Sequence, residues 1–167
     1  NISFTTVNLP RLGIKHGIIN NEKANLDGFF EELDEKINLI IEQLLERLEV
    51  QGNKKMKNFP FLMGQGVWKG SDDLGPEDTL KEVIKQGTLT IGFIGLAECL
   101  IALIGKHHGE SKEAQELGLK IVSHMRHKMD EATGKYKLNF SLMGTPAEGL
   151  SGRFTKIDKK VYGEIKG

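Results

Sequence analysis

The sequence has neither a surplus of one charge nor a second cysteine. Lys and Arg together number 23, as do Asp and Glu, so the formal net charge of the 167 residues is zero. Because no basic surplus creates an overall field that attracts polyanions, the composition argues against a DNA-binding protein. The single cysteine, Cys99, excludes an internal disulfide and a cysteine-based metal cluster, and this usage is typical of a reducing cytosol.

Long apolar runs are absent as well. No stretch approaches the ~20 apolar residues that cross a bilayer, and the first residues lack the basic and then apolar pattern of a signal peptide. We therefore expect a cytoplasmic protein with no membrane partner. The chain is long enough for one domain with a core and too short for two. It opens without Met on the strand-like segment NISFTTVNL, so we expect a piece of a longer protein.

The first third of the chain predicts a strand followed by a long helix. Residues 2–9 are rich in β-branched and aromatic side chains, and we expect Pro10 to end this strand and a glycine-containing loop to follow. Between residues 26 and 50, apolar side chains recur every three or four positions among charged ones, which indicates an amphipathic helix. Asn25 is placed to cap this helix, and Gly52 to end it.

The middle of the chain predicts a loop and a short helix. Residues 59–75 contain many glycines and no regular period, so we expect an irregular segment that its aromatic side chains hold to the core. Those side chains are Phe59, Phe61 and Trp68. Residues 76–86 begin with proline and acids and stop before a glycine, as is typical of a short helix.

Strands and helices alternate in the second half. Residues 88–94 predict a strand, Gly95 a turn, and the following apolar run a buried helix that ends at Gly105. An amphipathic helix is predicted for residues 110–132, and a further strand begins at Asn139. This alternation indicates an α/β fold with largely parallel strands. Since three strands bury the faces of a sheet poorly, we expect part of a larger barrel or sheet whose open edges pair with another copy.

The segment NFSLMGTPAEGLSGRF at residues 139–154 runs from a strand into a helix, and two interpretations of the junction stay open. In one, Thr145 caps the helix, Pro146 is its first residue, and Glu148 completes a capping box. In the other, free backbone N–H groups at the positive end of the helix bind an anion. These would be the amides of Ala147, Glu148 and Gly149. The local pattern favours capping, since most helix starts bind no anion.

Few other side chains suggest chemistry. Cys99 lies in the apolar helix, where a low dielectric disfavours the thiolate, so we expect a buried structural residue. His107 and His108 follow a helix end without an evident third ligand, which favours solvated loop histidines over a metal site. Glu98 stands in an otherwise apolar helix start, where either the helix dipole or a cleft would account for its carboxylate.

Three stretches of the sequence together resemble a known family. They are NISFTTVNLPRLGI, GTLTIGFIGLAECLIALIGKHHGES and NFSLMGTPAEGLSGRF. In this order they are similar to segments of the anaerobic ribonucleoside-triphosphate reductases, the glycyl-radical class of ribonucleotide reductases. The resemblance runs over residues 1–154 and is most specific in TPAEGLSGRF. It implies that residues 1–167 are a half-barrel-like fragment of one catalytic domain, a ten-stranded α/β barrel, with residues 155–167 as a charged, unfinished connection.

The resemblance also implies radical chemistry on a nucleotide. In that family a glycyl radical generates a cysteine thiyl, which removes the ribose 3′ hydrogen before the 2′ hydroxyl leaves as water, with formate as the usual reductant. The implied partners are a ribonucleoside triphosphate, ATP and deoxynucleotide effectors, a zinc ion, a radical-SAM activating protein and a second subunit of a homodimer. Asn1 would be a catalytic polar residue of the ribose site. The residues that would hold the substrate phosphates are Thr145, Pro146, Ala147, Glu148 and Gly149.

The motifs that carry the radical in this family are missing from the chain. The sequence has no Gly-Cys-Arg-like loop, no C-terminal glycyl-radical motif and no four-cysteine zinc site. We therefore expect the fragment to be inactive by itself. Two alternatives stay open: a non-catalytic module that joins a partner through the helix at residues 26–50, and another glycyl-radical enzyme such as a formate-lyase relative.

Overall fold

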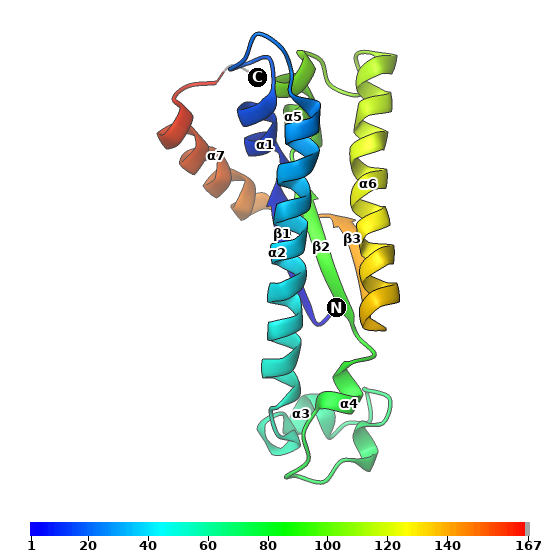
Figure 1. The fold of residues 1–167 in the computed structure, drawn as a ribbon. Helices are drawn as coiled ribbons and strands as arrows, with labels where there is room; N and C mark the ends of the chain where they lie inside the picture. Colours follow the sequence, from blue (N-terminus) through cyan, green and yellow to red (C-terminus); the bar gives the residue numbers. More distant parts are fainter. Residues whose placement is uncertain (166–167) are drawn as a thin grey trace.

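Three parallel strands form the centre of the structure, a computed structural model that describes residues 1–165 (Figure 1). β1 (Ser3–Asn8), β2 (Thr88–Ile94) and β3 (Asn139–Gly144) lie side by side in the order β1-β2-β3. The helices are α1 (Leu9–His16), α2 (Leu26–Gly52), α3 (Pro60–Met63), α4 (Lys81–Ile84), α5 (Leu96–Ile104), α6 (Lys112–Tyr136) and α7 (Glu148–Tyr162), with 3₁₀ turns η1 (Met56–Asn58) and η2 (Ser71–Asp73). Parallel strands need long crossovers, which helices supply here. The predicted α/β class with a parallel sheet is confirmed.

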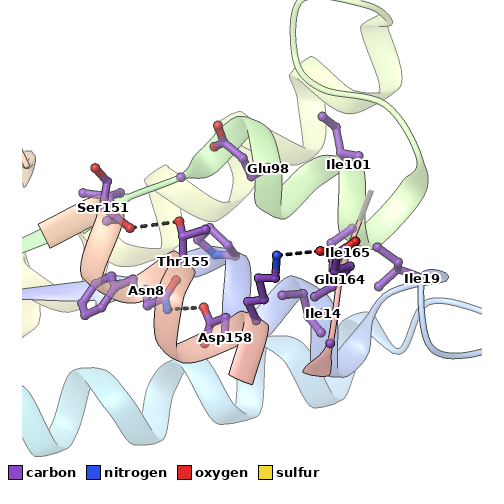
Figure 2. A pocket seen from close by; sticks show the side chains of 17 residues that line it. Asn8, Ile14, Ile19, Glu98, Ile101, Ser151, Thr155, Asp158, Glu164 and Ile165 are labelled. Carbon is purple, nitrogen blue, oxygen red and sulfur yellow. Dashed lines mark hydrogen bonds and ion pairs between the residues drawn. The ribbon is translucent and has the colours of Figure 1, made fainter. Parts of the chain in front are cut away.

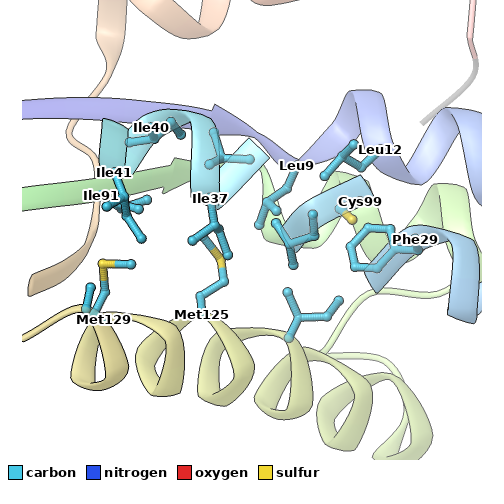
Figure 3. Close-up of a cluster of buried hydrophobic side chains, with 14 of the residues drawn as sticks. Leu9, Leu12, Phe29, Ile37, Ile40, Ile41, Ile91, Cys99, Met125 and Met129 are labelled. Atoms are coloured by element: carbon cyan, nitrogen blue, oxygen red, sulfur yellow. The ribbon is translucent and has the colours of Figure 1, made fainter. Parts of the chain in front are cut away.

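The two long helices, α2 and α6, cover one face of the sheet. Figure 3 shows Ile37 of α2 and Ile91 of β2 close to Met125 and Met129 of α6. All four side chains are fully buried. The buried apolar residues of α2 and of α6 recur every three or four positions, so each long helix presents one continuous apolar side to the strands.

The opposite face of the sheet carries Thr, Ser and Gly residues with two larger apolar side chains, and we call it the open face. Since side chains alternate along a strand, the strand register defines this face by Phe4, Thr6, Thr90, Gly92, Ser141 and Met143. Thr90 Oγ1 and Ser141 Oγ are 2.8 Å apart and share a hydrogen bond. Phe4 is 50% exposed, whereas Leu89 on the helix-covered face is 1% exposed. The helix-covered face therefore holds the core.

The first third of the chain contains one confirmed prediction and one that is wrong. Asn25 caps α2 as predicted, and α2 ends at Gly52. The loop predicted after Pro10 is instead helix α1, because proline is tolerated in a first helical turn, where its missing N–H is not needed. α1 packs closely on α5 because Gly13 has no side chain: a Cβ there would lie 2.7 Å from the carbonyl oxygen of Cys99.

The middle segment differs from its prediction in two respects. The helix predicted for residues 76–86 is reduced to α4. Phe61 is 80% exposed and Phe59 is also exposed, so the prediction that these two rings anchor the segment is wrong. A second apolar cluster holds it instead, with Trp68 packed against Met63, Leu80, Val83 and Ile84.

The second half follows its predicted order, with shifted ends. β2, α5 and β3 lie where they were predicted, and α6 continues to Tyr136, followed by Lys137 at a φ of 55°. The tail predicted as an unfinished connection from residue 155 is mostly helical, because α7 runs to Tyr162. Residues 166 and 167 of that tail lie outside the described residues. Between residues 1 and 165, no helix combines the length and the apolar character that crossing a membrane requires.

Candidate functional site

The junction between β3 and α7 begins with a residue that belongs to the sheet. Thr145 donates its backbone N–H to the carbonyl oxygen of Phe93 at 3.0 Å, which extends the β2–β3 ladder by one residue. The Thr145 hydroxyl lies 2.9 Å from the hydroxyl of Thr6 on β1. Both polar groups of Thr145 are therefore engaged by the sheet, and the predicted role of this side chain as the helix cap is wrong.

α7 starts without a side-chain cap. Its first residue is Glu148 rather than Pro146, its N-cap is Ala147, and no side chain accepts a hydrogen bond at this end. The first backbone bond of the helix runs from the N–H of Ser151 to the carbonyl oxygen of Ala147 at 2.9 Å. The amides of Glu148 and Gly149 precede that bond, at the end of the helix where the dipole is positive. The predicted capping box is wrong, while the geometry that could receive an anion is present.

A cavity of about 530 Å³ lies between α7, α1 and the start of α5 (Figure 2). Its apolar lining includes Ile14, Ile101 and Phe154, and the exposed carboxylate of Glu98 lines it as well. Both explanations given for the Glu98 carboxylate, the helix dipole and a cleft, therefore apply. The residue stands in the first turn of α5 and borders a cavity. None of the five predicted phosphate-binding residues lines this cavity.

A buried carboxylate joins α7 to α1, and sequence reasoning missed it. Asp158 is 6% exposed and accepts hydrogen bonds from Asn8 Nδ2 at 2.7 Å and from Arg11 Nε at 2.7 Å. Its partners lie about 150 residues earlier in the chain, so no local pattern could reveal the pairing. The charge of Asp158 is compensated by the Arg11 guanidinium, which is the condition for burying a carboxylate without a large cost.

The predicted site residues fall at two opposite edges of the sheet. Residues 145–149 follow the carboxyl end of β3. Asn1 lies at the other edge, since the N–H of the next residue, Ile2, bonds to the carbonyl oxygen of Thr88 at the start of β2. With a rise of about 3.3 Å per residue, the six residues of a strand separate the two edges by about 20 Å. The structure brings residues 145–149 together and does not bring Asn1 to them.

The remaining candidates lie away from this junction. Cys99 is fully buried in the core, and desolvation raises the pKa of its thiol to about 12, so its predicted burial is confirmed. His107 lies on a loop, where its Nδ1 accepts a hydrogen bond from the N–H of Gly109 at 3.0 Å. Across residues 1–165, His, Cys, Asp and Glu side chains form no group of three or more that could hold a metal ion.

Comparison with known proteins supports the resemblance of the three stretches. The family model described as anaerobic ribonucleoside-triphosphate reductase matches residues 1–167. The protein of that name from Haemophilus influenzae is 28% identical over 170 residues, which cover 100% of this chain and 23% of the relative. The one from Enterobacteria phage T4 is 30% identical over 168 residues, which cover 99% of this chain and 26% of the relative. The chain thus spans about a quarter of the length of these curated relatives.

A solved structure has a similar fold. It is the anaerobic ribonucleotide reductase from Thermotoga maritima with glycerol in the active site, with a TM-score of 0.66 and 19% sequence identity over 96% of this chain and 24% of that chain. At this identity the likeness concerns the fold. The family match, in contrast, includes every residue of the sequence, and the chain belongs to the anaerobic ribonucleoside-triphosphate reductase family.

Proposed function

We propose that this chain is part of the catalytic subunit of an anaerobic ribonucleotide reductase, which converts ribonucleoside triphosphates to deoxyribonucleoside triphosphates by radical chemistry. The observation that carries the proposal is the family match over residues 1–167. Within the subunit, this piece supplies part of the wall that holds the substrate phosphates. An uncapped helix start at the carboxyl edge of a parallel sheet supports that role, because α/β proteins commonly bind ligands at such an edge.

In this proposal the sheet is one part of a ten-stranded α/β barrel. α2 and α6 cover one face, as helices cover the outside of a barrel, and the open face lines the interior. Within residues 1–165, β1 and β3 are the two outer strands, and each has one strand neighbour. Further strands can therefore pair along the outer side of β1 and of β3. A homodimer of the complete cytoplasmic subunit belongs to the same proposal.

The substrate phosphates would meet the backbone N–H groups of Ala147, Glu148 and Gly149, whose partial positive charge favours phosphate oxygens. Thr145 and Pro146 would set the path of the chain from β3 to these amides. Thr145 ends the strand, and Pro146 has a fixed φ and no N–H. Glu148 is exposed, which leaves its carboxylate free to extend into solvent and away from a bound phosphate. Asn1 is proposed separately, as a polar residue of the ribose wall.

The radical chemistry requires a glycyl radical, a radical-forming cysteine and a zinc site. The described residues supply none of the three. In the complete enzyme, a glycyl radical formed by an activating protein would supply hydrogen abstraction and formate the reducing equivalents, while zinc and nucleotide effectors would bind outside this piece. Residues 1–165 contain no cluster suited to zinc. Cys99 is fully buried in the apolar core, where a substrate cannot reach its sulfur, so it does not fit the role of a radical-forming thiol. The chain by itself is therefore predicted to be inactive.

Titration of the 167-residue chain with a ribonucleoside triphosphate tests the phosphate role. We expect the amide NMR signals of Ala147, Glu148 and Gly149 to shift as millimolar CTP is added. The start of α6 is an internal control, because Ser111 Oγ already accepts a bond from the N–H of Ala114 at 3.1 Å. Unchanged signals at residues 147–149, or equal shifts at both helix starts, would contradict a phosphate site at α7.

The alternative of a helix-mediated interaction module has less support. The apolar stripe of α2 that would join a partner is already buried, with Leu33, Ile37 and Leu44 fully inaccessible in the core of this chain. The family match also names a reductase rather than a formate lyase. Both observations favour the reductase proposal.

A further inference from the structure

Thr6 of β1, Gly92 of β2 and Thr145, directly after β3, meet on the open face at the carboxyl ends of the strands. Thr6 on β1 and Thr145 after β3 share a hydrogen bond between their hydroxyl oxygens at 2.9 Å, across the central strand β2. The residue of β2 between them is Gly92. A Cβ at this position would lie 2.0 Å from Thr145 Oγ1 and 2.9 Å from Thr6 Oγ1. The two hydroxyls therefore occupy the space that a side chain at position 92 would fill.

The hydrogen bond to Thr6 decides which of two partners the Thr145 hydroxyl takes. The alternative partner is local, because a threonine oxygen can accept a hydrogen bond from a backbone N–H two residues ahead, here that of Ala147 at the start of α7. Here the oxygen points back to β1, and α7 has no side-chain cap. Without the Thr6 hydroxyl, Thr145 Oγ1 would lack its partner on the sheet and could turn toward the Ala147 amide. A capped helix start would have fewer free N–H groups for a ligand.

The same hydrogen bond also restricts the direction in which the chain leaves the sheet. The N–H of Thr145 is held by Phe93, and its side chain is held by Thr6, so both ends of this residue are attached. Only Pro146 and Ala147 separate it from the first residue of α7. Pro146 has a fixed φ, which leaves few torsions between the sheet and the helix start.

We infer that Thr6 is a positioning residue for the β3–α7 junction, acting through the hydroxyl of Thr145. It keeps that hydroxyl off the helix and sets the orientation of the free amides of α7. The effect on substrate rests on the proposed phosphate role of the junction. The positioning of Thr145 by Thr6 rests only on the contacts within the chain.

The open face provides a matched control. Thr90 and Ser141 form a second hydroxyl pair, at 2.8 Å, between β2 and β3. Thr90 is buried and lies on the same face as Thr6, and its pair does not involve the junction. Thr90→Val therefore removes the same kind of bond and reproduces any general loss of stability. Thr6→Ser retains the hydroxyl and serves as the rescuing variant.

The experiment compares Thr6→Val, Thr6→Ser and Thr90→Val in the 167-residue chain by amide hydrogen exchange and by titration with inorganic tripolyphosphate. For Thr6→Val we expect faster exchange of the Thr145 amide and an affinity for tripolyphosphate that is roughly two- to tenfold weaker. Thr6→Ser should resemble the wild type in both measurements. Thr90→Val should leave the Thr145 amide and the affinity unchanged.

The two proposals fail in different ways. If the wild type does not bind tripolyphosphate while exchange at Thr145 still depends on Thr6, the phosphate role fails and the positioning of the junction stands. If Thr6→Val behaves like Thr90→Val in exchange and in binding, the positioning role of Thr6 is overturned. The same conclusion holds if Thr6→Ser fails to restore the slow exchange of Thr145.

Discussion

Adding one methyl group at Gly92 should destabilise the chain by displacing Thr145. The new Cβ would lie 2.0 Å from Thr145 Oγ1, and real Cβ contacts essentially never fall under 3.0 Å, so the oxygen must move by at least 1.0 Å. The φ of Gly92 is not positive, which means that backbone strain does not contribute. The same Cβ would lie 2.9 Å from Thr6 Oγ1, so the outcome is decided by its contacts with the two threonine hydroxyls.

The magnitude follows from three contributions. Overpacking costs about 1–3 kcal/mol, and loss of the hydroxyl bond between Thr6 and Thr145 costs about 0.5–1.5 kcal/mol. Alanine offsets about 0.5–1 kcal/mol of this, because it restricts the unfolded chain more than glycine does. We expect Gly92→Ala to lower the free energy of unfolding by about 2 kcal/mol, measured from urea denaturation of the chain.

Two further variants make this measurement decisive. Gly144→Ala is the matched control, because a Cβ at the end of β3 would meet nothing within 4 Å. We expect it to raise the free energy of unfolding by about 0.5–1 kcal/mol. Thr145→Ala removes the oxygen that Gly92→Ala displaces, so the double variant should cost about 1–2 kcal/mol less than the sum of the single ones. Equal stability of Gly92→Ala and Gly144→Ala would refute the placement of Thr145 over Gly92.

Three other experiments test single groups, namely the buried carboxylate of Asp158, the buried thiol of Cys99 and the partly buried carboxylate of Glu32. Asp158→Asn removes the negative charge to which Asn8 and Arg11 donate hydrogen bonds. We expect it to weaken the attachment of α7 by about 1–3 kcal/mol and to speed hydrogen exchange along that helix. Unchanged exchange along α7 would contradict the pairing. Cys99 should react with a thiol reagent at pH 8 only in denaturant, because burial raises its pKa to about 12, and rapid labelling of the native chain would argue against this burial. Desolvation raises the pKa of Glu32, but hydrogen bonds from Lys15 and His16 outweigh it and hold the pKa below 4.5. The folded chain therefore prefers the carboxylate, whose contribution is complete above pH 4.5 and is lost as the pH falls through the lower folded pKa. Urea unfolding between pH 6 and pH 3 should show a smaller loss of stability for Glu32→Gln than for the wild type.

Sequence patterns predicted the elements whose formation depends on near neighbours. The long helix α2 follows from apolar residues three and four positions apart and from the cap at Asn25, all of which lie within a few turns of one another. β2 follows from a dense β-branched run before Gly95, whose left-handed φ of 72° ends the strand. Helix α1 was missed because Pro10 also fits a strand end. The local signal for the helix is Asn8, whose side chain caps it by accepting a bond from the N–H of Arg11.

The candidate site was predicted less completely than the fold, for a physical reason. The helix start was expected at Pro146, because Thr145 and Glu148 have the spacing of a capping box. In the structure the Thr145 hydroxyl bonds to Thr6, a residue 139 positions away, and the helix begins later. Asp158 likewise finds its partner Asn8 150 positions away. Such pairings depend on the sheet bringing distant segments together, which no local pattern contains.

β1 bonds both to the segment that precedes α7 and to α7 itself, and this places β1 in control of the direction of α7. Thr6 holds Thr145, three residues before the first residue of the helix. Asn8, two positions further along the same face, holds Asp158 within the helix, together with Arg11 of α1. Two separate attachments fix the direction of a rigid rod, whereas one lets it pivot. Thr6→Val and Asp158→Asn should therefore each produce a limited increase in hydrogen exchange along α7, and the double variant should exceed the product of the two. Independent, multiplicative effects on exchange would contradict this shared control.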